Sequence, residues 1–285
     1  MIDLHTHSTF SDGSCTPEQL AELAGKIGLT AVALTDHDCT DGVARFLAAS
    51  EKQKIRGIAG VEISADVRKG SLHILGYFLD PGNSSLRTTL RQIRNGREIR
   101  NKAILEKINA LGFKLTWDEV ASLAGEDVVG RPHFAQAMLA RGYVAKREQA
   151  FDLYLGKGKP GYADRFRLSP ADSIAVIREA GGVAVLSHPF TLGLGKEALR
   201  QYVADLADKG LQGIEAYYSE HTPEQTHQYL ALAEDCRLVA TGGSDFHGES
   251  NPAIKLGTGF GKLSVPDSIM AGLDSIRTGA QQAGG

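Results

Sequence analysis

The chain has 285 residues, of which 42% are hydrophobic and 23% are charged. This composition is ordinary for a globular protein, and the length suffices for one large domain or for a domain with an insertion. The formal net charge of −3 excludes a protein that holds nucleic acid through an overall positive charge.

Short apolar runs recur along the chain, and most of them end at a polar motif. The first run leads into His5 and His7, and the last leads into Ser244 and Asp245. Such runs are typical of strands that are buried on both faces of a sheet. The predicted strands cover residues 1–4, 31–34, 58–61, 74–78, 183–186, 214–218 and 238–240.

Start signals for helices lie between several of these runs. Thr16 can cap a helix whose first residue is Pro17, Gln19 can complete a capping box, and Gly28 can end the helix. The signal recurs at 169–172 and at 222–225, before helices that we expect to end near residues 180 and 233. Alternating strands and helices predict a parallel α/β protein, and seven units predict a closed barrel.

One section interrupts this alternation, because residues 86–162 contain no convincing strand. Residues 86–111 are predicted to form a long helix, and shorter helices are predicted over 116–123, 132–141 and 146–155. We expect a helical insertion over 101–163 that caps the mouth of a barrel formed by 1–100 and 164–285.

Side chains that can bind metal lie beside the predicted strands. In a strand, His5 and His7 share one face, so both imidazoles can bind one ion. Imidazoles with carboxylates suit Zn, Mn or Fe. A single histidine is more often a hydrogen-bonded core or surface residue, but ligands at successive strand ends are how a barrel enzyme builds a metal site. The predicted metal ligands are His5, His7, Asp12, His37, Glu62, His73, His188, Asp245 and His247.

His73 differs from the other ligands because it precedes its strand. If residues 65–70 form a tight turn, the strands on either side form a hairpin that returns His73 to the rim of Glu62. The barrel would then not be strictly parallel at this point.

These motifs resemble those of the PHP (polymerase and histidinol phosphatase) superfamily of metal-dependent phosphoesterases. The resemblance covers nearly the whole chain, and it implies an α/β fold, a distorted (β/α)7 barrel with a helical insertion domain. It also implies two or three divalent metal ions, with Mn favoured and Zn, Fe or Mg as alternatives. The implied groups are His5, His7, Glu62 and Asp245 for one ion, Glu62, His73 and His188 for a second, and Asp12, His37 and His247 for a third.

Within the insertion, Gly130-Arg131-Pro132-His133 and Gly156-Lys157-Gly158-Lys159 are similar to motifs of one bacterial branch. That branch contains 3′,5′-nucleoside bisphosphate phosphatases and a related 5′-3′ exoribonuclease. We therefore expect Arg131, His133 and Lys157 to bind substrate. The guanidinium of Arg131 matches phosphate oxygens, although a surface salt bridge is the alternative.

Two ions suffice for phosphoester hydrolysis by metal-activated hydroxide. A proton donor to the leaving oxygen would add to the rate; His221 is one candidate, and His188 is another if it is not bound to metal. His221 could equally be a surface residue that caps a helix, or it could bind substrate. The predicted catalytic residues are His188, His221 and Asp245.

Five arginines recur at steps of three and four residues on the long predicted helix: Arg87, Arg91, Arg94, Arg97 and Arg100. Such a stripe can attract a polyanion. Such a stripe is more often simply the solvated face of a helix, and we prefer this interpretation here.

The predicted activity is hydrolysis of the 3′-phosphate of nucleoside 3′,5′-bisphosphates, for example adenosine 3′,5′-bisphosphate to AMP and phosphate. One alternative is a 5′-3′ exoribonuclease that trims 5′-phosphorylated RNA or short oligonucleotides. Another is a non-catalytic PHP module, against which the complete set of ligands argues. The expected partner is a small nucleotide, with short RNA as the alternative, and no obligate protein partner is indicated.

The three cysteines, Cys15, Cys39 and Cys236, lie far apart and lack CxxC spacing. Free thiols and a cytoplasmic location are expected. The sequence shows no signal peptide and no apolar run of about 18 residues, so we expect no membrane contact.

Overall fold

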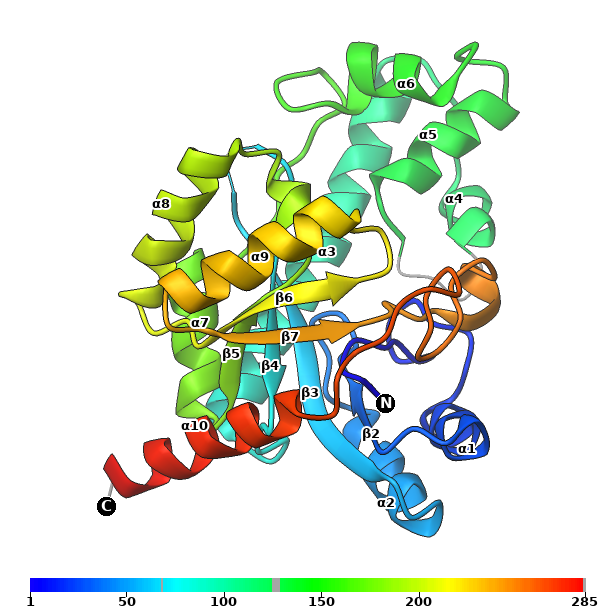
Figure 1. The fold of residues 1–285 in the computed structure, drawn as a ribbon. Coiled ribbons are helices and arrows are strands. Elements are labelled where there is room, and N and C mark those ends of the chain that lie inside the picture. Colours follow the sequence, from blue (N-terminus) through cyan, green and yellow to red (C-terminus); the bar gives the residue numbers. More distant parts are fainter. Residues whose placement is uncertain (68, 125–128, 284–285) are drawn as a thin grey trace. The chain divides into compact units, whose positions relative to one another are not determined.

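A computed structural model describes residues 1–67, 69–124 and 129–283 (Figure 1). These residues form two compact units. One comprises Met1–Leu90 together with the chain from Leu168 onward, and it contains the sheet; the other is helical and comprises Arg91–Arg167. The sequence places the insertion at 101–163, whereas the compact helical unit begins at Arg91 and ends at Arg167.

The first unit contains a seven-stranded sheet whose strands lie in sequence order. Each predicted apolar run forms one of them, because strands covered on both faces need apolar side chains on both faces. β3 is longer than the predicted 58–61, since its pairing with β4 continues to Ala65. The strands are β1 (Ile2–Asp3), β2 (Ala31–Leu34), β3 (Arg56–Ala65), β4 (Leu72–Tyr77), β5 (Val183–Leu186), β6 (Gly213–Tyr218) and β7 (Val239–Gly243).

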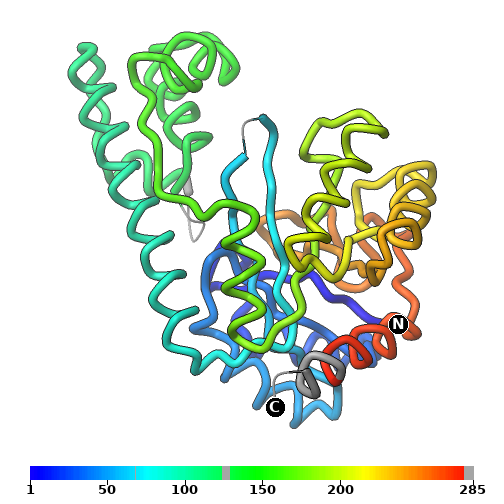
Figure 2. The backbone as a smooth tube through the Cα atoms, turned by 90° about the vertical axis from the view of Figure 1, so that its left-hand side faces the viewer, coloured from blue at the N-terminus to red at the C-terminus, as the bar shows by residue number. Residues whose placement is uncertain are grey.

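β4 is antiparallel to both of its neighbours, whereas the other paired strands are parallel. β3 and β4 form a hairpin that is visible as two adjacent cyan strands in Figure 2, with Ser64 opposite His73. The predicted hairpin is therefore confirmed, while residue 68 of its expected turn lies outside the described residues.

The sheet nearly closes between its first and last strands. Leu4 N donates to Gly242 O at 3.1 Å, and Thr6 forms a parallel bridge with Phe246. The expected distorted (β/α)7 barrel is thus confirmed.

Helices follow the strands of the first unit, and the predicted caps are present. Gln19 N donates to Thr16 Oγ1 at 3.3 Å and Thr16 N donates to Gln19 Oε1 at 2.8 Å, which is a complete capping box. Gly28, with φ of 79°, ends this helix. The helices are α1 (Pro17–Ile27), α2 (Val43–Lys52), α7 (Pro170–Glu179), α8 (Lys196–Ala207), α9 (Pro223–Asp235) and α10 (Ile269–Ala283), with short 3-10 segments η2 (Pro189–Leu192) and η3 (Gly248–Ser250).

An apolar core fills the end of the barrel at which β1, β2, β3 and β5 begin. It includes Ile2, Ile58, Tyr77 and Val183, and α10 contributes Met270. In Figure 1, α10 lies across this end of the sheet. The opposite end of the barrel is left for polar side chains.

The second unit has its own apolar core, formed by residues such as Ile104, Ile108, Phe134, Met138 and Leu155. The long helix begins in the first unit and continues into the second. Within the described residues of the insertion no strand occurs, as predicted. The helices are α3 (Ser84–Ala110), α4 (Trp117–Ala124), α5 (Arg131–Ala140), α6 (Arg147–Ala150) and a π-helix, η1 (Phe151–Leu155).

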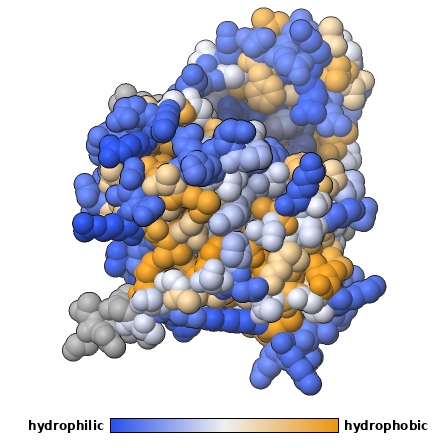
Figure 3. Space-filling model, in the orientation of Figure 1, coloured by the Kyte–Doolittle hydropathy of each residue, from blue (hydrophilic) through white to orange (hydrophobic). Residues whose placement is uncertain are grey.

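The face drawn in Figure 3 carries many hydrophilic residues, with apolar residues in patches between them. Among the residues that the structure describes, no helix is both long and apolar enough to cross a membrane.

Candidate metal centre

The predicted metal ligands gather at the end of the barrel opposite α10. His5 and His7 follow β1, Glu62 lies in β3 and Asp245 follows β7. Because β4 is antiparallel to β3, its first residues lie beside the last residues of β3, and His73 joins this end. The cluster comprises His5, His7, Asp12, His37, Glu62, His73, His188, Asp245 and His247.

The first group of donor atoms brings two imidazoles and two carboxylates together. Glu62 Oε2 lies 3.4 Å from both His5 Nε2 and His7 Nε2. Asp245 Oδ1 lies 3.3 Å from His5 Nε2 and 3.0 Å from His7 Nε2. A tetrahedral shell with bonds of about 2.0–2.1 Å separates its ligand atoms by roughly 3.3–3.4 Å. The observed spacing is therefore that of a ligand shell.

The imidazole nitrogens of this group also need a partner. His5 Nε2 and His7 Nε2 are buried, and neither makes a hydrogen bond. A buried polar atom without a partner costs free energy, and such atoms are rare. A divalent cation between the two nitrogens and the two carboxylates would satisfy them, so the residues present fit a metal ion.

The other oxygen of Glu62 faces a second group. Glu62 Oε1 lies 2.8 Å from His73 Nδ1 and 3.0 Å from His188 Nε2. Glu62 is only 1% exposed, so its carboxylate is surrounded by protein donors on both sides. One carboxylate that faces two groups of imidazoles can bridge two ions.

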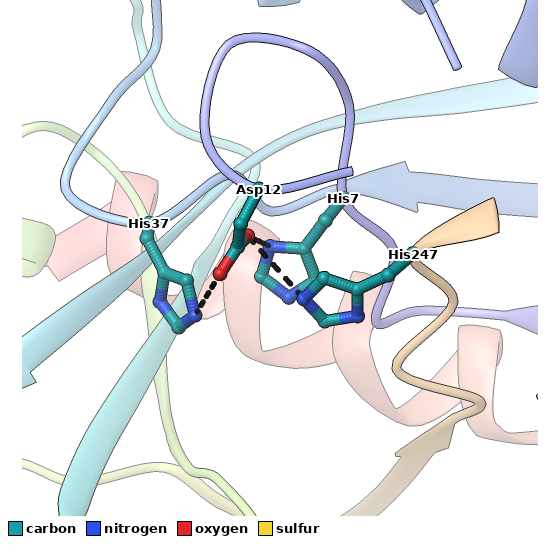
Figure 4. Close-up of side chains that lie close together, drawn as sticks. All are labelled: His7, Asp12, His37 and His247. Atoms are coloured by element: carbon teal, nitrogen blue, oxygen red, sulfur yellow. Dashed lines mark ion pairs between the residues drawn. The ribbon is translucent and has the colours of Figure 1, made fainter. Parts of the chain in front are cut away.

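A third group surrounds Asp12 (Figure 4). Asp12 Oδ1 lies 3.3 Å from His247 Nε2, and Asp12 Oδ2 lies 3.5 Å from His37 Nε2. The other nitrogen of His37, Nδ1, lies 3.0 Å from Glu62 Oε2. The sequence assigns His37 to the third group alone, whereas the structure places its ring between that group and Glu62. His7 is also shared, since its Nδ1 lies 3.6 Å from Asp12 Oδ1.

Burial and neighbouring charges shift the pKa values of several ligands in the cluster away from their usual values. Burial works against ionisation of Glu62, but nearby His37, His73 and His5 hold the pKa of Glu62 well below its usual range. Burial, together with the charge of His247, lowers the pKa of His7 to about 4. His7 is therefore neutral at pH 7 and has a lone pair to offer a cation.

His247 behaves in the opposite way. Burial tends to lower its pKa, but the hydrogen bond that His247 donates to Asp12 and the charge of Asp245 raise the pKa of His247 to about 9. In the absence of metal, both nitrogens of this imidazole are protonated at neutral pH, and the ring is positively charged. A metal ion that binds His247 must displace one of these protons.

Glu215 is hydrogen-bonded to His5 and to the backbone of His188, and so orients both residues. It was not among the residues predicted from the sequence. Its Oε1 lies 2.9 Å from His5 Nδ1, and its Oε2 accepts from His188 N at 2.8 Å. Carboxylates in this position fix the tautomer and the direction of a metal-binding imidazole. The sequence does contain a sign of its role: Glu215 is a carboxylate inside the apolar run that forms β6, and a carboxylate buried there needs a specific partner.

Further buried groups hold the ligand loops. Tyr218 OH donates to Asp245 Oδ2 at 2.7 Å, which leaves Oδ1 for His5 and His7. Asp36 accepts hydrogen bonds from Ser8 N, Ser8 Oγ and Ser11 Oγ, each at 2.7 Å, and so fixes the loop that carries Asp12.

Of the predicted proton donors, His188 lies within the cluster and His221 lies beside it. The ring of His221 contacts those of Phe190, Tyr218 and Tyr229, and its Nδ1 lies 2.9 Å from Ala216 O. Because a carbonyl only accepts, Nδ1 carries the ring proton. Burial lowers the pKa of His221, so the ring is neutral and its Nε2 is an acceptor.

The predicted substrate ligands of the insertion lie in the second unit. Arg131 is the first residue of α5; its Nη1 lies 3.5 Å from Leu155 O, and its guanidinium lies 5.5 Å from the centre of the Tyr162 ring. His133 Nδ1 accepts from Gly130 N at 3.0 Å and so helps to start the helix. Lys157 is exposed, two residues beyond Leu155.

Comparison with known proteins agrees with this geometry. The PHP domain family matches residues 3–154. A 3′,5′-nucleoside bisphosphate phosphatase of Chromobacterium violaceum is 34% identical over 86% of this chain and 87% of its own length. The 5′-3′ exoribonuclease Rnm of Salmonella typhimurium is also 34% identical, over 94% of this chain and 91% of its own.

A solved structure shares the fold. The crystal structure of a candidate metal-dependent phosphoesterase from Bifidobacterium adolescentis superposes with a TM-score of 0.76, at 32% identity, over 97% of this chain and 96% of that chain. The similarity therefore extends over both units and is not confined to the barrel.

Proposed function

This chain belongs to the PHP domain family and is a phosphoric ester hydrolase, and on that premise we propose that it hydrolyses the 3′-phosphate of nucleoside 3′,5′-bisphosphates. The observation that carries the proposal is the buried cluster of imidazoles around the Glu62 carboxylate. The substrate comes from the phosphatase of Chromobacterium violaceum, which is similar over most of the chain.

We further propose that two or three divalent ions bind the cluster, with Mn as the favoured metal. Bound there, such ions would lower the pKa of a water molecule and neutralise the charge of the phosphoryl oxygens. Glu62 would be shared between the first two groups, because its two oxygens face different imidazoles.

Other residues of the site would orient the metal ligands. Glu215 holds His5 in the tautomer that directs Nε2 at the first group, and Tyr218 holds Asp245. The neutral ring of His221 presents an acceptor at Nε2 and so has no proton to donate there. His188 would donate a proton only while the second group holds no ion, because its Nε2 faces Glu62 in that group. We propose that His221 binds a hydroxyl group of the substrate through Nε2.

Arg131, His133 and Lys157 stay predicted ligands for the phosphate that is not hydrolysed. A second activity is favoured by a specific finding, because the exoribonuclease relative is equally identical and is similar over more of this chain. Both substrates carry a nucleotide with a 5′-phosphate. A cytoplasmic location remains a prediction from the free thiols.

The proposal is tested by comparing rates on adenosine 3′,5′-bisphosphate and on 5′-phosphorylated RNA oligomers, each with Mn²⁺. We expect a higher kcat/KM on the bisphosphate and release of its 3′-phosphate. A higher kcat/KM on the RNA would favour the exoribonuclease, and turnover of neither would contradict the proposal.

Dependence on metal is tested on the same substrate. Chelation, Asp245→Asn and His7→Ala should each abolish turnover, because each removes metal or a ligand of the first group. His227→Ala, on the exposed side of α9, is the control and should leave the rate unchanged. Full activity of chelated, metal-free protein would rule out this mechanism.

A further inference from the structure

Two hydroxyl groups in the interior of the barrel lack partners. Tyr77 in β4 and Thr241 in β7 are both 0% exposed, and the hydroxyl oxygen of each is buried. Within the part of the chain that the structure describes, neither oxygen makes a hydrogen bond. A buried hydroxyl without a partner costs free energy, and such groups are rare in folded proteins. These two hydroxyls therefore require a partner that satisfies both.

The strands direct both side chains to the face that carries the metal ligands. Side chains alternate along a strand, so Tyr77 lies on the same face of β4 as His73. Thr241 is paired with Glu215 between β7 and β6, and paired residues of neighbouring strands share a face. Since the Glu215 carboxylate reaches His5, this face is the inside of the barrel.

The hydroxyl of Tyr77 also lies near buried carboxylates. Burial raises the pKa of Tyr77 well above its usual range, and negative charges nearby act in the same direction. These charges belong to Glu215, Asp3 and Glu62. The hydroxyl of Thr241 acts in the opposite direction and so lies close to Tyr77, although the geometry between the two is not that of a hydrogen bond. The phenol is neutral at pH 7 and has a proton to donate.

Two of these carboxylates have no room for a further donor. The oxygens of Asp3 accept from His5 N, Ser244 N, Ser244 Oγ and Gly257 N. A carboxylate offers about four positions to donors, so those of Asp3 are taken. The oxygens of Glu62 face the imidazoles of the first and second groups.

Glu215 differs, because one of its oxygens can accept a second donor. Its Oε2 accepts from His188 N at 2.8 Å and from Ser187 Oγ at 3.1 Å. Among the described residues, Oε1 accepts only from His5 Nδ1. The hydroxyl of Tyr77 does not reach Oε1 directly, since it makes no hydrogen bond. One water molecule can join them, because buried waters ordinarily make about three hydrogen bonds to such polar groups.

We propose that a buried water molecule accepts hydrogen bonds from Tyr77 OH and Thr241 Oγ1 and donates one to Glu215 Oε1. Tyr77 and Thr241 are then positioning residues for His5, because the water fixes the oxygen that accepts from the His5 ring. Neither hydroxyl touches metal or substrate. That His5 binds a metal ion rests on the proposed function, whereas the link from Tyr77 to Glu215 does not.

A crystal structure of the chelated, full-length protein, at a resolution that shows water, tests the link directly. We expect one ordered water within about 3.2 Å of Tyr77 OH, Thr241 Oγ1 and Glu215 Oε1. A direct hydrogen bond between Tyr77 and Thr241, or a dry space between the two hydroxyls and Glu215, would overturn the proposal.

Unfolding of the chelated protein tests whether the hydroxyls are satisfied. Tyr77→Phe keeps the ring and deletes one partner of the water. It should lower the Tm, because it leaves the water with one hydrogen bond fewer. Removal of a hydroxyl that had no partner would instead leave the Tm unchanged or raise it. A Tyr77→Phe protein at least as stable as the wild type would therefore contradict the link.

Metal affinity separates positioning from a purely structural role. In competition with a chelating dye, Tyr77→Phe should bind Mn²⁺ about three- to ten-fold more weakly, which is less than the loss typical of a direct partner of the ligand. Thr241→Val should show a similar loss, and Thr241→Ser, which keeps the hydroxyl, should bind as the wild type does. The half-buried Tyr202 in α8 gives the matched control Tyr202→Phe, which should leave the affinity unchanged.

The loss should also depend on Glu215. In a Glu215→Ala background, Tyr77→Phe should weaken metal binding no further, whereas independent structural damage would add to the first loss. Additive losses, or unchanged affinity in Tyr77→Phe alone, would overturn the positioning role. If Glu215→Ala fails to fold, the comparison of Thr241→Val with Thr241→Ser decides, and equal affinities in these two variants would contradict the proposal.

The link and the proposed function can fail separately. A wild type that binds no Mn²⁺ would contradict the proposed function, while the ordered water and the Tm of Tyr77→Phe would still decide the link. Conversely, a dry space beside Glu215 in a protein that binds metal and hydrolyses the bisphosphate would overturn the link alone.

Discussion

The atoms that face its two ring nitrogens decide what an imidazole of the cluster can do. His5 directs Nδ1 to Glu215 and Nε2 to the first donor group. In His37 the two nitrogens face Glu62 and Asp12. One imidazole ordinarily binds one ion, so the occupancy of the third group depends on which nitrogen of His37 carries the proton.

Glu215→Gln should weaken metal binding, because the amide holds the tautomer of His5 less firmly than a carboxylate does. Loss of such a partner typically costs ten- to a hundred-fold in metal affinity. Competition with a chelating dye gives the affinity of the variant and of the wild type. The exposed Glu220, which lies just beyond β6, gives the control Glu220→Gln. Unchanged affinity in Glu215→Gln would show that the backbone alone directs His5.

Arg131→Ala should damage hydrolysis of nucleoside bisphosphate far more than hydrolysis of an aryl phosphate. A remote phosphate contact helps to position the reacting group, and the small ester never makes that contact. Its loss should cost about 1.5–3 kcal/mol, or roughly ten- to a hundred-fold in kcat/KM.

Steady-state kinetics on both substrates decide the role of Arg131, with Arg147→Ala, exposed in the same unit, as the control. Equal losses on the two substrates would mean that Arg131 serves the fold or the metal centre. No loss on either would remove it from the binding site.

At the residue scale the sequence predicted the donor set but not its surroundings. Motifs at strand ends identify His5, His7 and Asp245, because chemistry and position coincide there. The buried Glu215 was hidden inside an apolar run, and the burial of Arg100, which is 6% exposed, was hidden inside a periodic stripe of arginines. Whether a charged residue is buried depends on which segments cross it, and that information is spread over the chain.

At the element scale, glycine allows β7 to reach the metal centre. A Cβ on Gly243 would overlap the backbone nitrogen and the Cβ of His5, so the last strand can pass the first ligand only without a side chain there. The same close approach accompanies the near closure of the sheet.

Gly243→Ala should therefore disturb both the barrel and the metal site, because backbone atoms of His5 cannot move away as a flexible side chain can. We expect a lower Tm and weaker metal binding, measured by circular dichroism and by dye competition. Gly272→Ala in α10 is the matched control. Its Cβ would lie 3.4 Å from Val239, and alanine favours a helix by up to about 1 kcal/mol. A Gly243→Ala protein as stable as wild type would refute the close approach.

The elements themselves were largely predictable. The apolar runs became strands, and the capping sequences at Thr16, Ser169 and Thr222 became helix starts. What local sequence could not give was the end of β3, since its last residues are ordered by pairing with β4. The extent of the helical unit was also underestimated, because α3 runs through its boundary without any local break.

For the whole molecule, the opposed pKa shifts of the cluster predict how stability depends on pH. Burial lowers the pKa of His7 to about 4, below the value of about 6.5 for an unfolded histidine. Between these values the unfolded chain binds more protons, so stability rises with pH. For His247, burial is outweighed by Asp12 and Asp245, and its pKa rises to about 9. Between pH 6.5 and pH 9 the native state binds more protons than the unfolded chain, so the free energy of unfolding falls as pH rises through this range.

Chelated protein should consequently be most stable near pH 6.5. Urea unfolding at a series of pH values measures this, and His247→Gln should flatten the alkaline side of the curve. A stability that keeps rising up to pH 9 would contradict the assigned shifts.

Asp3 in β1 is hydrogen-bonded to the chain that follows β7, and this has a consequence for the synthesis of the protein. Its carboxylate accepts from Ser244 N at 2.8 Å, 241 residues further along the chain, and from Gly257 N at 2.7 Å. At about 5–20 residues per second, a ribosome needs roughly 12–50 s to synthesise that stretch. During this time β1 has been translated but its partners at the closing edge have not. The strand that leads into His5 and His7 is therefore synthesised well before the residues that hold it at the closing edge, and a nascent chain that stops before Asp245 cannot complete the metal centre.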